Sequence, residues 1–176
     1  IYILLSCFYL ILFFCIFFLN LRITYAIMSF VDKNKKIQYL NISSFIAQIE
    51  EVKDSGLSEQ AFVVASPYLE KKSLLEVSSK AKDAGLKKGM SLALAKSLCS
   101  QVKVISPNFD LYDRIQKKIQ QFISSRYPLY EFDSLGKTYV DYTGLSSIYG
   151  EVKSQAQGLQ KRIQEKFSLA AWVGVS

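Results

Sequence analysis

Carboxylates, lysines and thiols are the side chains on which any chemistry of this chain depends, because its 176 residues include no histidine. Three carboxylates, Glu131, Asp133 and Asp141, fall within one short segment that has the pattern of a strand pair. Carboxylate oxygens are ligands that Mg²⁺ prefers, so three on one face could hold this ion. Side chains alternate between the two faces of a strand, however, and carboxylates outside a motif are mostly solvent-exposed. We therefore expect structural or solvated roles for these acids, with a metal site as the alternative.

Lysine and arginine residues give the chain a formal net charge of +7 and stand in short groups. These groups are Lys33/Lys35/Lys36, Lys71/Lys72, Lys80/Lys82/Lys87/Lys88, Lys117/Lys118 and Lys161/Arg162/Lys166. Such groups either contact phosphates or form solvated helix faces and loops, and the sequence leaves both interpretations open. The eleven tyrosines and twelve phenylalanines do not alternate with basic residues, so the sequence indicates no base-stacking platform.

The three cysteines form neither a CxxC pair nor the pattern of a disulfide-rich protein. Cys7 and Cys15 lie in an apolar N-terminal run, and Cys99 stands alone at the end of a predicted helix. A reducing compartment is the simplest expectation.

Residues 1–27 form an apolar segment that has two interpretations. As a helix rising ~1.5 Å per residue, residues 1–19 would reach about 28 Å, close to the ~30 Å of a bilayer core. Basic residues follow this run and none precedes it, so a real span would leave the remaining chain cytoplasmic. The alternative is a mis-assigned gene start, because the segment MSFVDKNKKIQYL from Met28 has the composition of the beginning of a soluble protein.

Hydrophobic periodicity after Met28 alternates between that of strands and that of helices. Strands are predicted at residues 37–42, 61–65, 73–77, 101–105, 130–135, 137–142 and 170–175. Helices are predicted at residues 45–52 behind a Ser43/Ser44 cap, at 91–99, from 107–108 to the Tyr127–Pro128 break, and at 152–167. Interleaved strands and helices predict a mixed α/β or α+β domain.

Five segments resemble, in order, motifs of the Y-family of UmuC/DinB-type translesion DNA polymerases. They are residues 40–50 (LNISSFIAQIE), 78–90 (SSKAKDAGLKKGM), 106–112 (SPNFDLY), 134–141 (SLGKTYVD) and 171–176 (AWVGVS). The resemblance implies an α+β fold, in which an incomplete, ferredoxin-like polymerase palm carries a small fingers subdomain inserted at about residues 57–105. Residues 28–176 would then be one UmuC-like domain, preceded by an apolar N-terminal helix within residues 1–27.

The metal-binding positions that the resemblance implies are changed in this chain. Polymerases of this kind use carboxylates on two adjacent strands to hold two Mg²⁺ ions, and the matching positions hold Asn41, Gly136 and Lys137. Asparagine offers one neutral oxygen, glycine offers no side chain, and lysine brings a positive charge that repels a cation. Although the family uses Mg²⁺, we expect no metal, no cofactor and no catalytic residue here.

The nucleotide-binding positions that the resemblance implies have changed as well. The triphosphate-contacting Tyr and Arg of the family correspond to Ser79 and Lys82, and its steric-gate aromatic, which excludes ribonucleotides, corresponds to Ile46. A lysine can still bind phosphate, but without the bidentate geometry of arginine. The predicted phosphate-binding set is Lys82, Ser79, Lys80, Lys87 and Lys88.

The resemblance, together with the changed positions, predicts a non-catalytic polymerase-like protein of DNA repair, similar to accessory proteins that recruit an active polymerase in translesion synthesis. Its expected partners are DNA, bound weakly, and an active polymerase or other replication and repair proteins, in the setting of an SOS response. One alternative is an active error-prone polymerase with a diverged metal site. Another is a membrane-tethered binding module, which requires that residues 1–27 are translated. The expected location is the cytoplasm, or the inner membrane for the tethered form.

Overall fold

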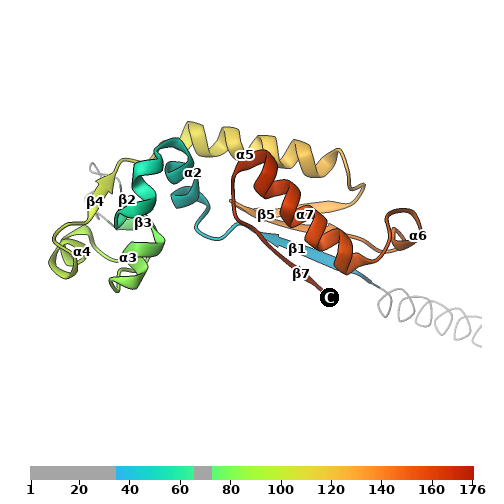
Figure 1. The fold of residues 1–176 in the computed structure, drawn as a ribbon, viewed down its shortest axis with the longest axis horizontal. Coiled ribbons are helices and arrows are strands. Elements are labelled where there is room, and N and C mark those ends of the chain that lie inside the picture. Colours follow the sequence, from blue (N-terminus) through green and yellow to red (C-terminus); the bar gives the residue numbers. More distant parts are fainter. Residues whose placement is uncertain (1–34, 66–72) are drawn as a thin grey trace, which may run out of the picture. The chain divides into compact units, whose positions relative to one another are not determined.

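The computed structural model describes residues 35–65 and 73–176. Residues Ile37–Ser176 form one compact unit in which strands and helices interleave as the periodicity predicts (Figure 1). The predicted apolar segment 1–27 lies outside the described residues. Within the described ranges, no helix is long and apolar enough to cross a bilayer.

A four-stranded antiparallel sheet organises the larger part of this unit. Its strands lie in the order β5 (Tyr130–Ser134), β6 (Lys137–Asp141), β1 (Ile37–Asn41) and β7 (Trp172–Val175). Helix α5 (Phe109–Ser124) precedes β5, and α7 (Val152–Phe167) connects β6 to β7 after the short α6 (Ser146–Tyr149). This order of strands and helices is the ferredoxin-like arrangement, so the predicted ferredoxin-like α+β fold is confirmed.

The two long helices bury apolar stripes in one core with the sheet. Leu40 and Val140 of the sheet meet Tyr112, Ile119, Phe122, Ile123, Leu159 and Ile163 of α5 and α7 in this core. Helical spacing also predicts inward positions for Phe109, Val52 and Leu98, but these residues are 59%, 52% and 54% exposed. Each of these residues lies in the first or last turn of its helix, beyond the part of the apolar stripe that is buried.

The chain between α2 (Phe45–Lys53) and α5 forms a second sheet, and we call this part the insertion. Its strands lie in the order β3 (Leu74–Val77), β2 (Phe62–Ala65) and β4 (Lys103–Ile105). Two helices accompany them, α3 (Ser79–Asp83) and α4 (Leu92–Leu98), and a 3-10 helix spans Ser55–Glu59. In Figure 1 the insertion occupies the end of the unit beyond α2.

Strand β2 belongs to two cores, because all four of its residues are buried. Val63 and Ala65 pack in the core of the insertion, whereas Phe62 and Val64 pack in the core of the four-stranded sheet. Alternate side chains of a strand point to opposite faces, and apolar residues on both faces are typical of a strand covered on both sides. The insertion is therefore joined to the larger core by shared packing.

Candidate functional site

A pocket of about 570 Å³ brings together the end of β1, the start of β6 and the insertion. Its lining residues are Asn41, Ile42, Ser43, Ser44, Phe45, Ile46, Glu76, Lys82, Lys88, Ser134, Leu135 and Lys137. The pocket thus contains several of the positions that the sequence singled out, although they come from three separate segments of the chain.

Asn41 and Lys137 lie directly opposite each other on the adjacent strands β1 and β6. Residues in such cross-strand positions have Cβ atoms ~4.5–5.5 Å apart, so both side chains share one small region of the pocket. A Mg²⁺ ion in this region would meet one neutral amide oxygen and one positively charged ammonium. These two positions are close together, as a two-strand metal site requires, but their side chains do not fit the metal.

Gly136 is buried in the turn between β5 and β6, where its φ of +74° is left-handed. Its N–H donates to Gln116 Oε1 at 2.9 Å, and its carbonyl accepts from the Ile42 N–H at 2.8 Å. A Cβ atom here would lie 2.9 Å from the Ile42 carbonyl oxygen and 3.1 Å from the Phe45 ring. The backbone therefore leaves no room for a carboxylate at this position unless the turn shifts.

Lys82 of α3 reaches from the insertion to the start of α2, where its ammonium donates to the Ser44 hydroxyl. Ser44 has a left-handed φ of 51°, and its hydroxyl makes no capping hydrogen bond to the helix. The predicted side-chain cap at Ser43/Ser44 is therefore wrong, because the hydroxyl of Ser44 faces Lys82 instead of the first turn. Lys82 is held at the pocket wall by this contact.

Glu76 is a pocket residue that sequence reasoning missed. Its side chain is buried, with Oε1 accepting from the Val77 N–H at 3.2 Å and Oε2 lying 3.8 Å from the Lys88 ammonium. Its position inside an apolar strand offered no signal of a functional role. Three lysines and one carboxylate thus line the pocket, which gives it a positive balance that favours anions.

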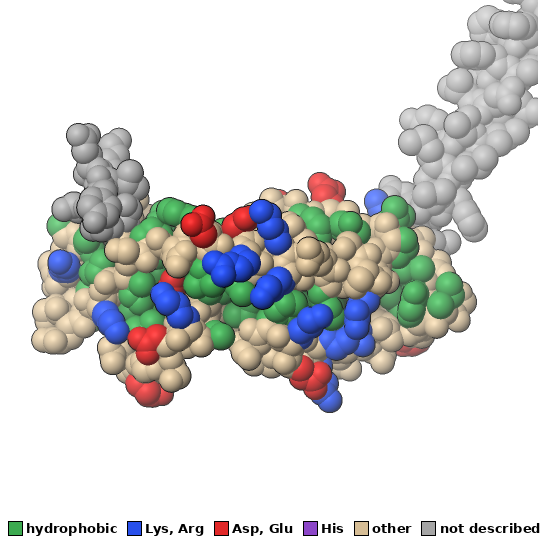
Figure 2. Space-filling view, turned by 90° about the horizontal axis from the view of Figure 1, so that it is seen from above, with side chains coloured by type: hydrophobic (Ala, Val, Ile, Leu, Met, Phe, Trp, Pro, Cys, Tyr) green, Lys and Arg blue, Asp and Glu red, His purple; other side chains and the backbone are tan. Residues whose placement is uncertain are grey.

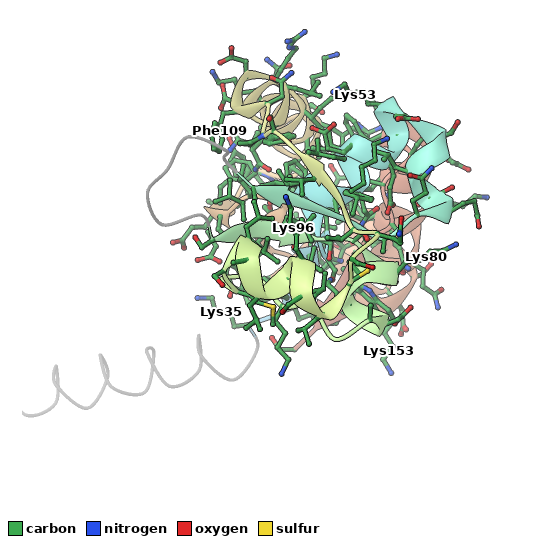
Figure 3. All side chains as sticks on the ribbon, turned by 90° about the vertical axis from the view of Figure 1, so that its left-hand side faces the viewer. Lys35, Lys53, Lys80, Lys96, Phe109 and Lys153 are labelled. Atoms are coloured by element: carbon green, nitrogen blue, oxygen red, sulfur yellow. The ribbon has the colours of Figure 1, made fainter. Side chains whose placement is uncertain are left out.

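Ser79, Lys80 and Lys87 do not line this pocket, although the sequence placed them with Lys82 and Lys88. Lys80 forms an ion pair with Glu59 at 2.8 Å, and the hydrogen bond that it donates lowers the pKa of Glu59. In the end-on view of Figure 3, Lys53, Lys80 and Lys96 lie apart from one another. The basic side chains at this end of the molecule are therefore spread over α2, α3 and α4.

Glu131, Asp133 and Asp141 do not converge on the pocket. Asp141 pairs with Ile37, at the opposite end of β1 from Asn41, and its Oδ1 accepts from the Thr143 N–H at 2.9 Å. Across the part of the chain that the structure describes, no three residues of the types His, Cys, Asp and Glu are grouped so that they could hold a metal ion. The alternative of a relocated metal site gains no support.

The sequence profile of the impB/mucB/samB family matches residues 40–176. DNA polymerase IV of Dehalococcoides mccartyi is 25% identical over 142 residues, which are 81% of this chain and 36% of the relative. DNA polymerase IV of Bacillus velezensis is 28% identical over 145 residues, which are 82% of this chain and 35% of the relative. The chain thus spans little more than a third of the length of these curated relatives.

Solved structures share the fold of the described unit. The crystal structure of DinB from Sulfolobus solfataricus superposes with a TM-score of 0.74 at 20% identity, over 80% of this chain and 42% of that one. An insertion ternary complex of Dbh DNA polymerase gives a TM-score of 0.71 at 22% identity, over 80% and 42% of the two chains. These similarities confirm the palm with its inserted fingers as the fold.

Proposed function

Because the chain belongs to the impB/mucB/samB family, we propose that it is a non-catalytic Y-family polymerase-like domain that supports translesion DNA synthesis by binding DNA and partner proteins. The observation that carries this proposal is the Gly136 turn, in which a Cβ would lie 2.9 Å from the Ile42 carbonyl oxygen. The position that the resemblance equates with a metal ligand therefore lacks both the carboxylate and the space for one.

Two-metal nucleotidyl transfer needs ions that activate the attacking hydroxyl and neutralise the leaving phosphate charge. Here the two remaining positions hold Asn41 and Lys137, which face each other across the strand pair. Reversing only the changes at Asn41 and Lys137 does not restore the site, because Asn41→Asp and Lys137→Glu still leave the Gly136 position without a carboxylate. This argument supports a role in binding rather than in phosphoryl chemistry.

DNA is the proposed ligand because the relatives are named DNA polymerase IV and because the pocket is positively charged. Figure 2 shows Lys and Arg side chains spread along the face seen there, with Asp and Glu among them. Affinity for DNA rises with the number of phosphates that a protein neutralises, so a scattered basic surface predicts weak binding. An active polymerase or another repair protein is the proposed protein partner, and the cytoplasm is the proposed location.

An active polymerase with a diverged metal site is the second candidate function, and Glu76 is the observation that favours it. This carboxylate lines the same pocket as Asn41, so the two side chains offer a cation one carboxylate and one amide oxygen. Lys82, Lys88 and Lys137 line the same space, however, and the Lys88 ammonium is 3.8 Å from Glu76. Their positive charges oppose a divalent ion there, so we rank this candidate below the non-catalytic one.

Primer extension by the full chain tests these two functions directly. A primed template is incubated with all four deoxynucleotides and either Mg²⁺ or Mn²⁺, with a DNA polymerase IV as the positive control. We expect no extension by the native chain or by an Asn41→Asp/Lys137→Glu double variant, while a gel-shift assay still detects DNA binding. Templated extension by the native chain that is abolished by Glu76→Gln would overturn the proposal in favour of the diverged polymerase.

A further inference from the structure

Three aromatic side chains, Tyr39, Tyr139 and Trp172, share the face of the four-stranded sheet that α5 and α7 leave open. Leu40 and Val140 pack in the core, so their neighbours Tyr39 and Tyr139 point to the opposite face. Trp172 precedes Val173, which packs against the same core, and it therefore points to the open face as well. These aromatics belong to the adjacent strands β6, β1 and β7.

The geometry of this face leaves the rings accessible. Tyr39 and Tyr139 are paired across β1 and β6, with ring centroids 4.8 Å apart and ring planes tilted by 31°. On its other side Tyr39 faces Gly174, where an added Cβ would have no atom of the described residues within 4 Å. Trp172 is 71% exposed. We call Tyr39, Tyr139 and Trp172 the aromatic face.

Positive charge adjoins one end of the aromatic face. Asn41 pairs with Trp172 on one side and with Lys137 on the other, so the tryptophan and this ammonium flank the same residue. Lys137 lines the pocket together with Lys82 and Lys88. An elongated ligand could therefore place flat, apolar groups on the aromatic face and anionic groups in the pocket.

We propose that the aromatic face binds single-stranded DNA, with unpaired bases stacked on Trp172 and Tyr39 and with phosphates held by Lys137 and Lys82. This inference rests on the proposed DNA-binding function and specifies the form of DNA. Every base has a flat π-face that can stack on an aromatic ring, and nearby cations hold the backbone. In duplex DNA these π-faces are already stacked on neighbouring base pairs. The aromatic face therefore binds single-stranded DNA in preference to duplex DNA.

Trp172 is the single tryptophan of the chain, so its fluorescence reports this contact directly. The experiment adds an oligothymidine strand, or a duplex of mixed sequence, to the full chain and follows tryptophan fluorescence and the anisotropy of labelled DNA. We expect the single strand to quench Trp172 and to bind more tightly than the duplex. Trp172→Ala and Tyr39→Ala should each weaken binding of the single strand roughly tenfold, the effect typical of losing one base–aromatic stack.

Tyr149→Ala is the matched control, since Tyr149 is also an exposed aromatic residue but lies on α6. It should leave both DNA affinities unchanged, and thermal melting should show that every variant is folded.

DNA binding that depends on Lys137 but not on Trp172 or Tyr39 would overturn the proposed role of the aromatic face while leaving the proposed function intact. Quenching of Trp172 by a DNA polymerase IV but not by DNA would assign this face to a protein and overturn the proposal. Absence of any DNA binding would contradict both proposals.

Discussion

At the scale of single residues, Gly136 is required by both its backbone conformation and its surroundings. We expect Gly136→Ala to lower the free energy of unfolding by about 2–5 kcal/mol, because a left-handed φ costs ~1–2 kcal/mol and a forced contact in a packed site ~1–3 kcal/mol. Urea denaturation measures this change. Gly144→Ala is the control, because Gly144 has φ +75° but an added Cβ there would lie within 4 Å of no atom in residues 35–65 and 73–176. Equal losses for the two variants would contradict the steric argument.

The candidate site was only partly predictable from the sequence. Asn41 and Lys137 were expected on adjacent strands because their motifs follow a known order, and the structure places them opposite each other. Glu76 was not expected, because a carboxylate inside an apolar strand resembles an ordinary exposed residue until the pocket is formed. Ser44 was interpreted as a helix cap, since a serine before an apolar helix usually is one, but the contact with Lys82 comes from a distant part of the chain.

At the scale of secondary-structure elements, one buried hydrogen bond ties α2 to α5. Tyr112 donates to Glu50 Oε1 at 2.6 Å, both residues are 1% exposed, and the Lys53 ammonium lies 3.1 Å from Glu50 Oε2. Burial raises the pKa of Tyr112, and the hydrogen bond to Glu50 raises it further. The folded protein therefore favours the protonated tyrosine, and this contribution to stability is complete below pH ~10, where an unfolded tyrosine also keeps its proton.

Tyr112→Phe tests the importance of this hydrogen bond. We expect a loss of about 1–3 kcal/mol at pH 8, because Glu50 stays buried with one partner fewer. As the pH rises from about 10 to about 12, the free energy of unfolding of the native chain should fall, and it should fall less steeply in the variant. A residual fall is expected, because burial also raises the pKa of Tyr127 and Tyr142. Urea denaturation across this range measures both effects, and identical slopes would contradict the role of Tyr112.

The longer helices and strands were predictable because a hydrophobic repeat can be recognised only over a segment of several residues. The strands of both sheets and the helices α2, α4, α5 and α7 all begin and end near the predicted residues. Helices α3 and α6 and the 3-10 helix were not predicted, since four or five residues do not complete two helical turns and so show no periodic stripe. Their positions are set by contacts such as the Ser78 hydroxyl, which accepts from the Ala81 N–H at the start of α3.

At the scale of the whole molecule, topology brings together residues that no local pattern connects. Tyr39, Tyr139 and Trp172 are far apart in the sequence, and only the order β6, β1, β7 makes them neighbours. The sequence indicated no base-stacking platform, because aromatic and basic residues do not alternate within any one segment. In the proposed binding of single-stranded DNA, such a surface is instead built by single residues from separate strands.

The same topology predicts that the insertion and the four-stranded sheet unfold together. Val63 and Ala65 pack in one core while Phe62 and Val64 pack in the other, so β2 cannot leave one core without disturbing both. Val63→Ala should lower the free energy of unfolding by about 1–3 kcal/mol, because Val63 is fully buried. Hydrogen exchange should then quicken in β1 by the same factor as in β2, although β1 lies outside the core of the insertion. Faster exchange confined to the insertion would instead show that it opens as a separate unit.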